Sequence, residues 1–432
     1  MKRLFTNTTI LTMTDDAVLR NASLVVDGTT ISYVGTNPPQ DHYDETVDCS
    51  GRLLMPGLVN THGHAAMTLL RGYGNDLPLQ TWLQEKMWPM EARFGPEQVR
   101  WGTSLAVVEM LKGGTTCFAD MYDRMDEVAK VVEESGIRAS LCRGVIGFGP
   151  EEEKSAKLAE AVRFAGDWNG AASGRVTTML GPHAPYTCPP DFIEKFVEAS
   201  GELDLPISIH MSETTFEVEQ NIKDYGKRPV EHLLNLGVFD RPAIVAHAVH
   251  LTDGEIAVLA ECDAKVSHNP GSNLKLGSGI ARIPEMLSAG MRPSLGTDGA
   301  ASNNNLDMFE EVRLAALIHK GNSLDPLAVP ATEALKMGTV YGAEGLFLSE
   351  SVGTLAVGKK ADFIALDLSR PHLHPQGDLN DLVSHVAYSA ICSDVRDVYI
   401  DGEQVVRDGV CTNLDEEEVV AKANAAWAKI SG

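Results

Sequence analysis

The sequence predicts an α/β protein, in which a (β/α)8 TIM barrel carries a small composite β-sandwich domain built from both chain ends. Two observations predict this fold. Residues 56 to 349 alternate short apolar runs with longer helical patterns, and about eight such units suit a barrel of parallel strands. Both chain ends instead carry short strands separated by turn residues. Neither end is long enough to fold alone, so we expect the two to pair.

The division of the chain into domains follows from this change in the predicted secondary-structure pattern. We expect residues 1–56 to form the first part of the composite β domain and residues 57–350 the barrel. Residues 351–432 should supply the second part of the β domain and a terminal helix.

The two ends share the pattern of a β-hairpin. Leu24 to Val26 leads into Asp27-Gly28 and then into the run 31–35, and Asp-Gly between such runs is a hairpin signal. Near the other end, residues 361–367 are expected to form a strand and residues 398–406 a second hairpin.

The middle region supplies the expected barrel strands and helices. Helical patterns include residues 99–112 and 127–135. The expected strands are the apolar runs at residues 53–55, 116–119, 139–142, 176–180, 207–209, 243–246, 264–267 and 293–296.

Composition excludes several classes of protein. Of 432 residues, 44% are hydrophobic, enough for a sizeable core and against disorder. The net charge of −24 repels phosphate backbones and anionic lipid, so neither nucleic acid nor a membrane is an expected partner. No apolar run is long enough to span a membrane, and the N-terminus lacks a signal-peptide core. The seven scattered cysteines indicate reduced thiols, so we expect a cytoplasmic protein.

Histidines end two of the apolar runs. His62 and His64 follow residues 53–61, and side chains two positions apart on a strand face the same side, so both imidazoles can share one metal ion. His210 ends the run 205–209, and Glu213 follows three residues later. This pairing suggests a metal ligand beside an acid–base group.

Two further runs end in polar residues. His247 ends the run 243–246, and His250 follows it; we expect His247 to take part in chemistry and His250 to be structural. Asp298 ends the run 293–297, where a buried carboxylate is costly unless it is paired or metal-bound.

Active sites of parallel barrels lie at the C-terminal ends of the strands, where all of these side chains are expected. Three histidines and an aspartate with a water suit Zn²⁺ or Fe²⁺. Such a metal can make a hydroxide nucleophile from water near neutral pH. We therefore expect one divalent metal per subunit, with Zn²⁺ preferred and Fe²⁺ as the alternative, which makes this a metal-dependent barrel.

Several motifs resemble those of the amidohydrolase superfamily, and more closely its aminohydrolase branch. They are residues 56–64, 68–72, 88–91, 113–116, 181–186, 210–213 and 296–299. Within that branch, the sequence is similar to the 5′-methylthioadenosine/S-adenosylhomocysteine deaminase family over essentially the whole chain.

The resemblance implies a role for each candidate residue. The implied metal ligands are His62, His64, His210 and Asp298, and the implied substrate contacts are Glu91, Arg143, His183 and Glu213. Local chemistry agrees, since the Glu91 carboxylate can accept from both hydroxyls of a ribose diol. Arg143 can pair with an anionic tail, and His183 can hydrogen-bond the base.

The implied reaction is hydrolytic deamination of adenine nucleosides: 5′-methylthioadenosine, S-adenosylhomocysteine and adenosine. Glu213 would donate a proton to N1, while Asp298 and His247 would help to activate the attacking water. Residues 174–187 contain no lysine, unlike the two-metal amide-cleaving relatives, which favours one metal per site. The resemblance also suggests a homo-oligomer, a tetramer.

Two other functions stay open at this point. An s-triazine hydrolase, or another purine or pterin aminohydrolase of the superfamily, would share the metal and differ in the pocket. A non-enzymatic metal-binding scaffold on the same barrel is the other, and the presence of both Glu213 and Asp298 argues against it.

Overall fold

Two parallel sheets form the larger part of the computed structural model, which describes residues 1–15, 17–377 and 381–432. The first has the order β10-β8-β7-β6 with β9 paired to β8, and the second has the order β11-β12-β13-β14. Their strands are β6 (Leu58–Asn60), β7 (Thr115–Tyr122), β8 (Arg138–Val145), β9 (Val176–Thr178), β10 (Gly181–Pro182), β11 (Ile207–Met211), β12 (Ala243–His247), β13 (Lys265–His268) and β14 (Ser294–Leu295).

Backbone contacts join the two sheets at both edges. A parallel bridge links Leu180 to Ile207 at one edge. At the other, the Thr61 amide donates to the Leu295 carbonyl at 2.9 Å and the Asp298 amide to the His62 carbonyl at 3.0 Å. The strands therefore surround one interior, as the predicted (β/α)8 barrel requires, and every residue of β7 is buried, as expected for a strand covered on both faces.

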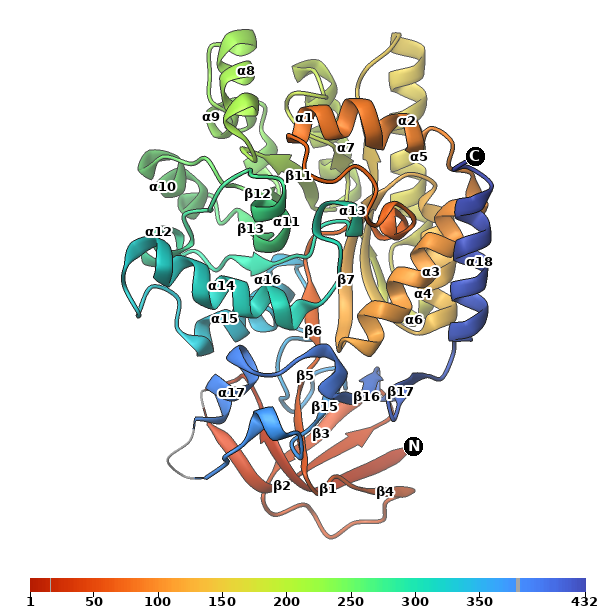
Figure 1. Ribbon diagram of the computed structural model, residues 1–432, viewed down its shortest axis with the longest axis vertical. Helices are drawn as coiled ribbons and strands as arrows, with labels where there is room; N and C mark the ends of the chain where they lie inside the picture. Colours follow the sequence, from red (N-terminus) through yellow and green to blue (C-terminus); the bar gives the residue numbers. More distant parts are fainter. Residues whose placement is uncertain (16, 378–380) are drawn as a thin grey trace.

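Helices cover the outside of these strands (Figure 1). In α4, buried Val128 and Val132 recur at helical spacing while Lys130 is more exposed, which is the pattern of a helix lying on a sheet. The longer barrel helices are α3 (Pro96–Lys112), α4 (Met125–Ser135), α5 (Glu151–Trp168), α7 (Pro190–Leu203), α8 (Thr215–Tyr225), α9 (Pro229–Asn235), α10 (Asp253–Glu261), α14 (Met308–Ser323) and α15 (Ala331–Met337).

Short helical segments fill the connections. Those at or near the C-terminal ends of the strands are η1 (Ala65–Leu70), α1 (Leu79–Thr81), η2 (Trp82–Met87), α2 (Trp88–Glu91), α11 (Pro270–Lys275) and α13 (Ala300–Asn303). The others are α6 (Ala171–Gly174), η3 (Val238–Asp240), α12 (Ile283–Ser288), α16 (Val340–Gly345), η4 (Pro371–Leu373), α17 (Leu382–Tyr388) and η5 (Cys392–Asp394).

A nine-stranded sheet joins the two ends of the chain below the barrel (Figure 1). The antiparallel pairing of β5 with β15 makes the connection, and the rings of Phe5, Phe363 and Tyr399 pack together in its core. The predicted small sandwich is thus one continuous hydrogen-bonded sheet around this core. Its strands are β1 (Lys2–Leu11), β2 (Val18–Asp27), β3 (Thr30–Gly35), β4 (Glu45–Asp48), β5 (Arg52–Pro56), β15 (Phe363–Asp367), β16 (Val395–Ile400), β17 (Glu403–Arg407) and β18 (Val410–Cys411).

The boundary between sheet and barrel differs from the expectation in one respect. The run 53–55, expected to be a barrel strand, lies in β5 of the composite sheet, and the first barrel strand is the shorter β6. Gly57 separates the two strands, and a Cβ there would lie 2.0 Å from Thr116 Oγ1, so only glycine fits. His62 and His64 consequently follow the end of β6 rather than lying on it.

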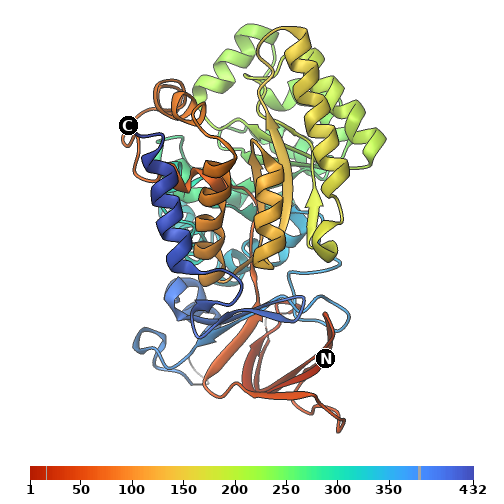
Figure 2. The ribbon, with the colours of Figure 1, turned by 90° about the vertical axis from the view of Figure 1, so that its right-hand side faces the viewer.

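The last helix, α18 (Glu416–Ala428), returns from the composite sheet to the barrel and packs beside α3 (Figures 1 and 2). No helix in the described part of the chain is long and apolar enough to cross a membrane. Domain limits at residues 56 and 350 stay a proposal.

Candidate active site

The site lies at the C-terminal ends of the barrel strands, around a cavity of about 530 Å³. His210 lies within β11, His247 ends β12, and Asp298 follows β14. Both His247 and Asp298 have left-handed backbone conformations, with φ of 73° and 60°, which turn the chain at the strand end. The predicted residues that line the cavity are His64, Glu91, Arg143, His183, His210, Glu213, His247 and Asp298; His62 is buried beside them.

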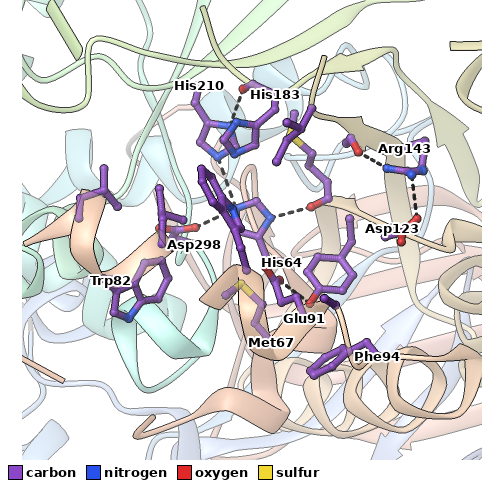
Figure 3. Close-up of a pocket in the computed structure, with 18 of the residues that line it drawn as sticks. His64, Met67, Trp82, Glu91, Phe94, Asp123, Arg143, His183, His210 and Asp298 are labelled. Atoms are coloured by element: carbon purple, nitrogen blue, oxygen red, sulfur yellow. Dashed lines mark hydrogen bonds and ion pairs between the residues drawn. The ribbon is translucent and has the colours of Figure 1, made fainter. Parts of the chain in front are cut away.

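The rings of His64 and His210 and the carboxylate of Asp298 come together in the cavity (Figure 3), and the ring of His62 is buried beside them. Asp298 Oδ1 lies 3.2 Å from His64 Nε2 and 3.4 Å from His62 Nε2. His210 Nε2 lies 3.4 Å from His64 Nε2. These side chains form two groups, and within each group all the possible ligand atoms lie within 4.8 Å of one another. The first group is His62, His64 and His210, and the second is His62, His247 and Asp298.

The other ring nitrogens fix the direction of two of these histidines. His64 Nδ1 donates to the Met121 carbonyl at 2.6 Å, and His210 Nδ1 donates to the His183 carbonyl at 2.8 Å. In neutral rings, the lone pairs are then on the two Nε2 atoms, which face each other. Within the part of the chain that the structure describes, the buried His62 Nε2 has no partner in hydrogen-bond geometry, although Asp298 Oδ1 lies 3.4 Å away. A cation among these atoms would satisfy all three nitrogens, so the donor set fits a divalent metal.

Asp298 dominates the electrostatics of the cluster. Burial alone would raise the pKa of this carboxyl, but the close contacts and charge of the His62 and His64 rings hold it well below its usual range. Burial disfavours the charged form of His64, yet the contact with Asp298 raises its pKa to about 9. The second oxygen of Asp298, Oδ2, accepts from Ser272 Oγ at 2.7 Å and from Ser302 Oγ at 2.8 Å. The carboxylate therefore stays ionised and fixed.

Glu213 is the second carboxyl group of the cavity, and its titration differs. Burial raises its pKa above the usual range, while the nearby His247 opposes that rise. Ser278 Oγ donates to Oε1 at 3.1 Å, and His247 Nε2 lies 3.7 Å from Oε2. The two buried carboxyl groups thus have pKa values shifted in opposite directions, which is the arrangement of an acid and a base in one site.

His247 is oriented by Asn273 on α11. The Asn273 Oδ1 atom lies 2.8 Å from His247 Nδ1 and accepts its hydrogen. The lone pair of the neutral ring is then on Nε2, on the side of Glu213. His250 has another partner, since its Nε2 lies 2.7 Å from the Ser278 carbonyl oxygen.

The other predicted residues also line the cavity, with His183 beside His210 and Arg143 farther away beside Asp123 (Figure 3). Glu91 Oε1 accepts from Tyr122 Oη at 2.6 Å. Arg143 contacts two carboxylates, Asp123 at 2.9 Å and Glu160 at 3.2 Å. His183 Nδ1 lies 2.9 Å from Thr187 Oγ1, and burial lowers the pKa of its ring to about 3. Apolar side chains, including Trp82, Phe94 and Met67, complete the wall.

Comparison with known proteins shows the family of the chain. The sequence matches the amidohydrolase family over residues 53–405. The chain belongs to the amidohydrolase family. A relative from Syntrophomonas wolfei, named 5-methylthioadenosine/S-adenosylhomocysteine deaminase, is 46% identical over 100% of both chains.

Two solved structures show the same fold. A zinc-bound adenosine deaminase from Xanthomonas campestris is 35% identical and covers 99% of this chain and 98% of its own, with a TM-score of 0.93. An atrazine chlorohydrolase from Arthrobacter aurescens complexed with zinc is 25% identical, with a TM-score of 0.89, over 98% of this chain and 100% of its own. The predicted fold class and family are therefore confirmed.

Several residues of this amidohydrolase site were not singled out from the sequence. Tyr122, Asn273, Ser278 and the serines on Asp298 all reach the site through side-chain hydrogen bonds. Ser272 and Asn273 lie in the small polar run Asn269–Asn273, and such a run beside barrel strands was a usable signal. Tyr122 ends the buried strand β7, and nothing in its local sequence marks its contact with Glu91.

Proposed function

We propose that this amidohydrolase removes the 6-amino group of adenine nucleosides by hydrolysis. The substrates would be 5′-methylthioadenosine, S-adenosylhomocysteine and adenosine, and the products their inosine analogues and ammonia. The observation that carries the proposal is the pair Glu213 and Asp298, two buried carboxyl groups on one cavity with opposite pKa shifts. The full-length similarity to proteins named for this activity supports it.

His62, His64, His210 and Asp298 would hold the metal, for which we propose zinc because relatives bind it. When bound, a divalent metal supplies Lewis acidity that lowers the pKa of water towards neutrality. The hydrogen bonds from Nδ1 of His64 and His210 keep both rings aimed at this position.

Two carboxyl groups would move the protons. Glu213 in its protonated form donates to N1 of the purine, which makes C6 a better acceptor for the oxygen of water. Asp298 accepts a proton from the attacking water and passes it to the departing amino group, which leaves as ammonia. His247, with its Nε2 lone pair directed towards Glu213, accepts a hydrogen bond from the water. As the C6 carbonyl forms, the remaining proton of the former water returns to Glu213, so water and nucleoside give the inosine analogue and ammonia with both carboxyl groups restored.

Three residues would recognise the nucleoside. Glu91 would accept from the ribose hydroxyls, His183 would hydrogen-bond the base, and Arg143 would pair with an anionic tail. Asp123 and Glu160 already offset much of the charge on Arg143. We therefore expect a tail that carries both charges to bind better than a purely anionic one.

Steady-state ammonia release tests the proposal, with metal analysis of the same sample. The panel is 5′-methylthioadenosine, S-adenosylhomocysteine, adenosine, guanine and a chlorinated s-triazine. We expect the three adenine nucleosides to have the highest kcat/KM values. A triazine turned over faster than every nucleoside would contradict the proposal and favour the triazine hydrolases that share this fold.

Two expectations stay predictions. A homotetramer should appear in light scattering of the purified protein, and a cytoplasmic location in fractionated cells.

A further inference from the structure

Two barrel helices begin with the same four-residue pattern. Thr214 and Glu217 begin α8, and Thr252 and Glu255 begin α10. Thr-x-x-Glu predicts a capping box, in which each side chain accepts from the other residue's backbone N–H. In α10 this box is formed: Thr252 Oγ1 accepts from the Glu255 amide at 3.2 Å, and Glu255 Oε2 accepts from the Thr252 amide at 2.8 Å.

At α8 only half of the box is formed. Thr214 Oγ1 accepts from the Glu217 amide at 3.2 Å, as expected. The Glu217 carboxylate instead extends past Thr214 and accepts from the backbone amides of Ser212 and Glu213, one at each oxygen and both at 2.8 Å. Glu217 is 1% exposed. A buried carboxylate is therefore bonded to the backbone of Glu213 itself.

The turn held in this way has a strained backbone. Ser212 has a φ of 53°, in the left-handed region, where a non-glycine residue persists only if its surroundings hold it. Its carbonyl accepts from the amides of Val249 and His250, both at 3.0 Å. Contacts from α8 on one side and from the segment after β12 on the other thus fix the residue before Glu213.

We propose that Glu217 is a positioning residue for Glu213. By accepting from both backbone amides it fixes the turn so that the Glu213 carboxyl group stays between Ser278 Oγ and His247 Nε2. This inference rests on the proposed function, because Glu213 acts as the proton donor only in that reaction. Among the described residues that line the cavity Glu217 is not found, and its carboxylate is bonded to the backbone of Ser212 and Glu213, so it would act through Glu213.

The first experiment needs no turnover. In Glu217→Gln one of the two acceptor oxygens becomes an NH₂ group, which faces a backbone N–H. We expect the amides of Ser212 and Glu213 to exchange hydrogen at least about tenfold faster than in the unaltered protein. Glu255→Gln is the matched control, since it removes the same kind of acceptor at the equivalent position of α10, and it should leave these two amides unchanged. Unchanged exchange in Glu217→Gln would overturn the proposal.

The second experiment separates positioning from loss of stability. We expect Glu217→Gln to lower kcat at least about tenfold while KM and metal content stay within about threefold. In a Glu213→Gln background, the same change should alter kcat by less than about twofold, because its target is already removed. An equal fold-loss in both backgrounds would mean a merely structural role and would overturn the proposal. Glu255→Gln should lower only the unfolding temperature.

Failure of the variant to fold and failure of the proposed function can be told apart. If Glu217→Gln does not fold, Glu217→Asp keeps both acceptor oxygens on a shorter side chain, and the same exchange and kinetic criteria apply to it. If the unaltered protein releases no ammonia from any nucleoside, the proposed function fails, and the exchange experiment alone decides whether Glu217 holds the turn.

Discussion

The guanidinium of Arg138 and the carboxylate of Asp362 form a buried two-point ion pair between the barrel and the composite sheet. Arg138 Nε donates to Oδ2 at 2.8 Å and Nη2 to Oδ1 at 3.1 Å. Nη2 also donates to Asp401 at 2.6 Å. Arg138 begins β8, whereas Asp362 directly precedes β15. One guanidinium thus pairs with two carboxylates at the junction of the two parts, and Lys360 Nζ lies 3.7 Å from Asp401 as a second cation.

Removing that cation should destabilise the protein strongly. Arg138→Met would leave the buried Asp362 carboxylate without its cation, and breaking a buried pair in this way costs about 3–5 kcal/mol. Urea unfolding measures the loss. Arg163→Met is the control, since its pair with Asp126 is exposed, and exposed pairs contribute about 0–1 kcal/mol. Similar losses in the two variants would show that the junction does not depend on Arg138.

The metal cluster leads to a second prediction. His62→Ala combined with His64→Ala removes two of the four proposed ligands, so the barrel should fold but bind almost no metal and lose its activity. Metal analysis, circular dichroism and ammonia release check these points. His232→Ala removes a buried histidine that stacks on Tyr225 outside the site and should keep the metal. A double variant with full metal content would refute the ligand assignment.

A third prediction concerns the proton donor. Glu213→Gln keeps the shape of the side chain but cannot deliver an acidic proton, so kcat should fall by ~10²–10⁴-fold while KM and metal content persist. Burial raises the pKa of Glu213, so its proton is retained to higher pH and kcat should decline as pH rises through that pKa. This decline should be missing in the variant. Glu219→Gln, an exposed change on α8, which follows Glu213, is the control. A loss below about tenfold for Glu213→Gln would exclude the role.

The strand-end residues could be predicted because their signal is local. A run of apolar residues that ends in His210, His247 or Asp298 marks both the strand and its functional end, and the structure brings these residues around one cavity. The barrel and the pairing of the chain ends followed from similar local patterns.

Contacts between distant segments could not be predicted in this way. Tyr122 reaches Glu91, and Asn273 reaches His247, only because the segments that carry them pack over the barrel mouth. The same holds for Glu217, since its Thr-x-x-Glu pattern is indistinguishable from that of Glu255, and only the geometry of the preceding turn separates their bonds. The strand boundary at Gly57 was missed because apolar residues stand on both sides of Pro56 and Gly57, so residues 53–59 resemble a single strand.

Arg143 allows a fourth prediction, on the tail of the substrate. Arg143→Ala should lower kcat/KM for S-adenosylhomocysteine, which carries a carboxylate, more than for neutral 5′-methylthioadenosine. The measurement is the ratio of the two kcat/KM values in each protein. Arg124→Ala, a change at another cation of the cavity wall, shows whether any lost positive charge has the same effect. An equal loss for both substrates would mean that Arg143 only holds Asp123 and Glu160 in place.

Glu91 carries the last prediction, which concerns the ribose. Its Oε1 atom accepts from Tyr122, and no other hydrogen bond to this carboxylate is found within the described ranges, so Oε2 is available to a ligand. If Glu91 binds the ribose hydroxyls, 2′-deoxyadenosine should be a poorer substrate than adenosine, because the missing hydroxyl leaves a desolvated acceptor unpaired at a cost of about 1–3 kcal/mol. Glu91→Ala should lower kcat/KM for adenosine strongly and narrow the difference in kcat/KM between adenosine and 2′-deoxyadenosine. Tyr122→Phe removes only the partner of Oε1, so it should lower kcat/KM for both nucleosides while retaining most of the difference between them. Comparing kcat/KM for the three proteins on both nucleosides separates a substrate contact from a structural role, since only a contact changes the ratio. An unchanged ratio in Glu91→Ala would remove the main reason at residue level for preferring a nucleoside to a triazine.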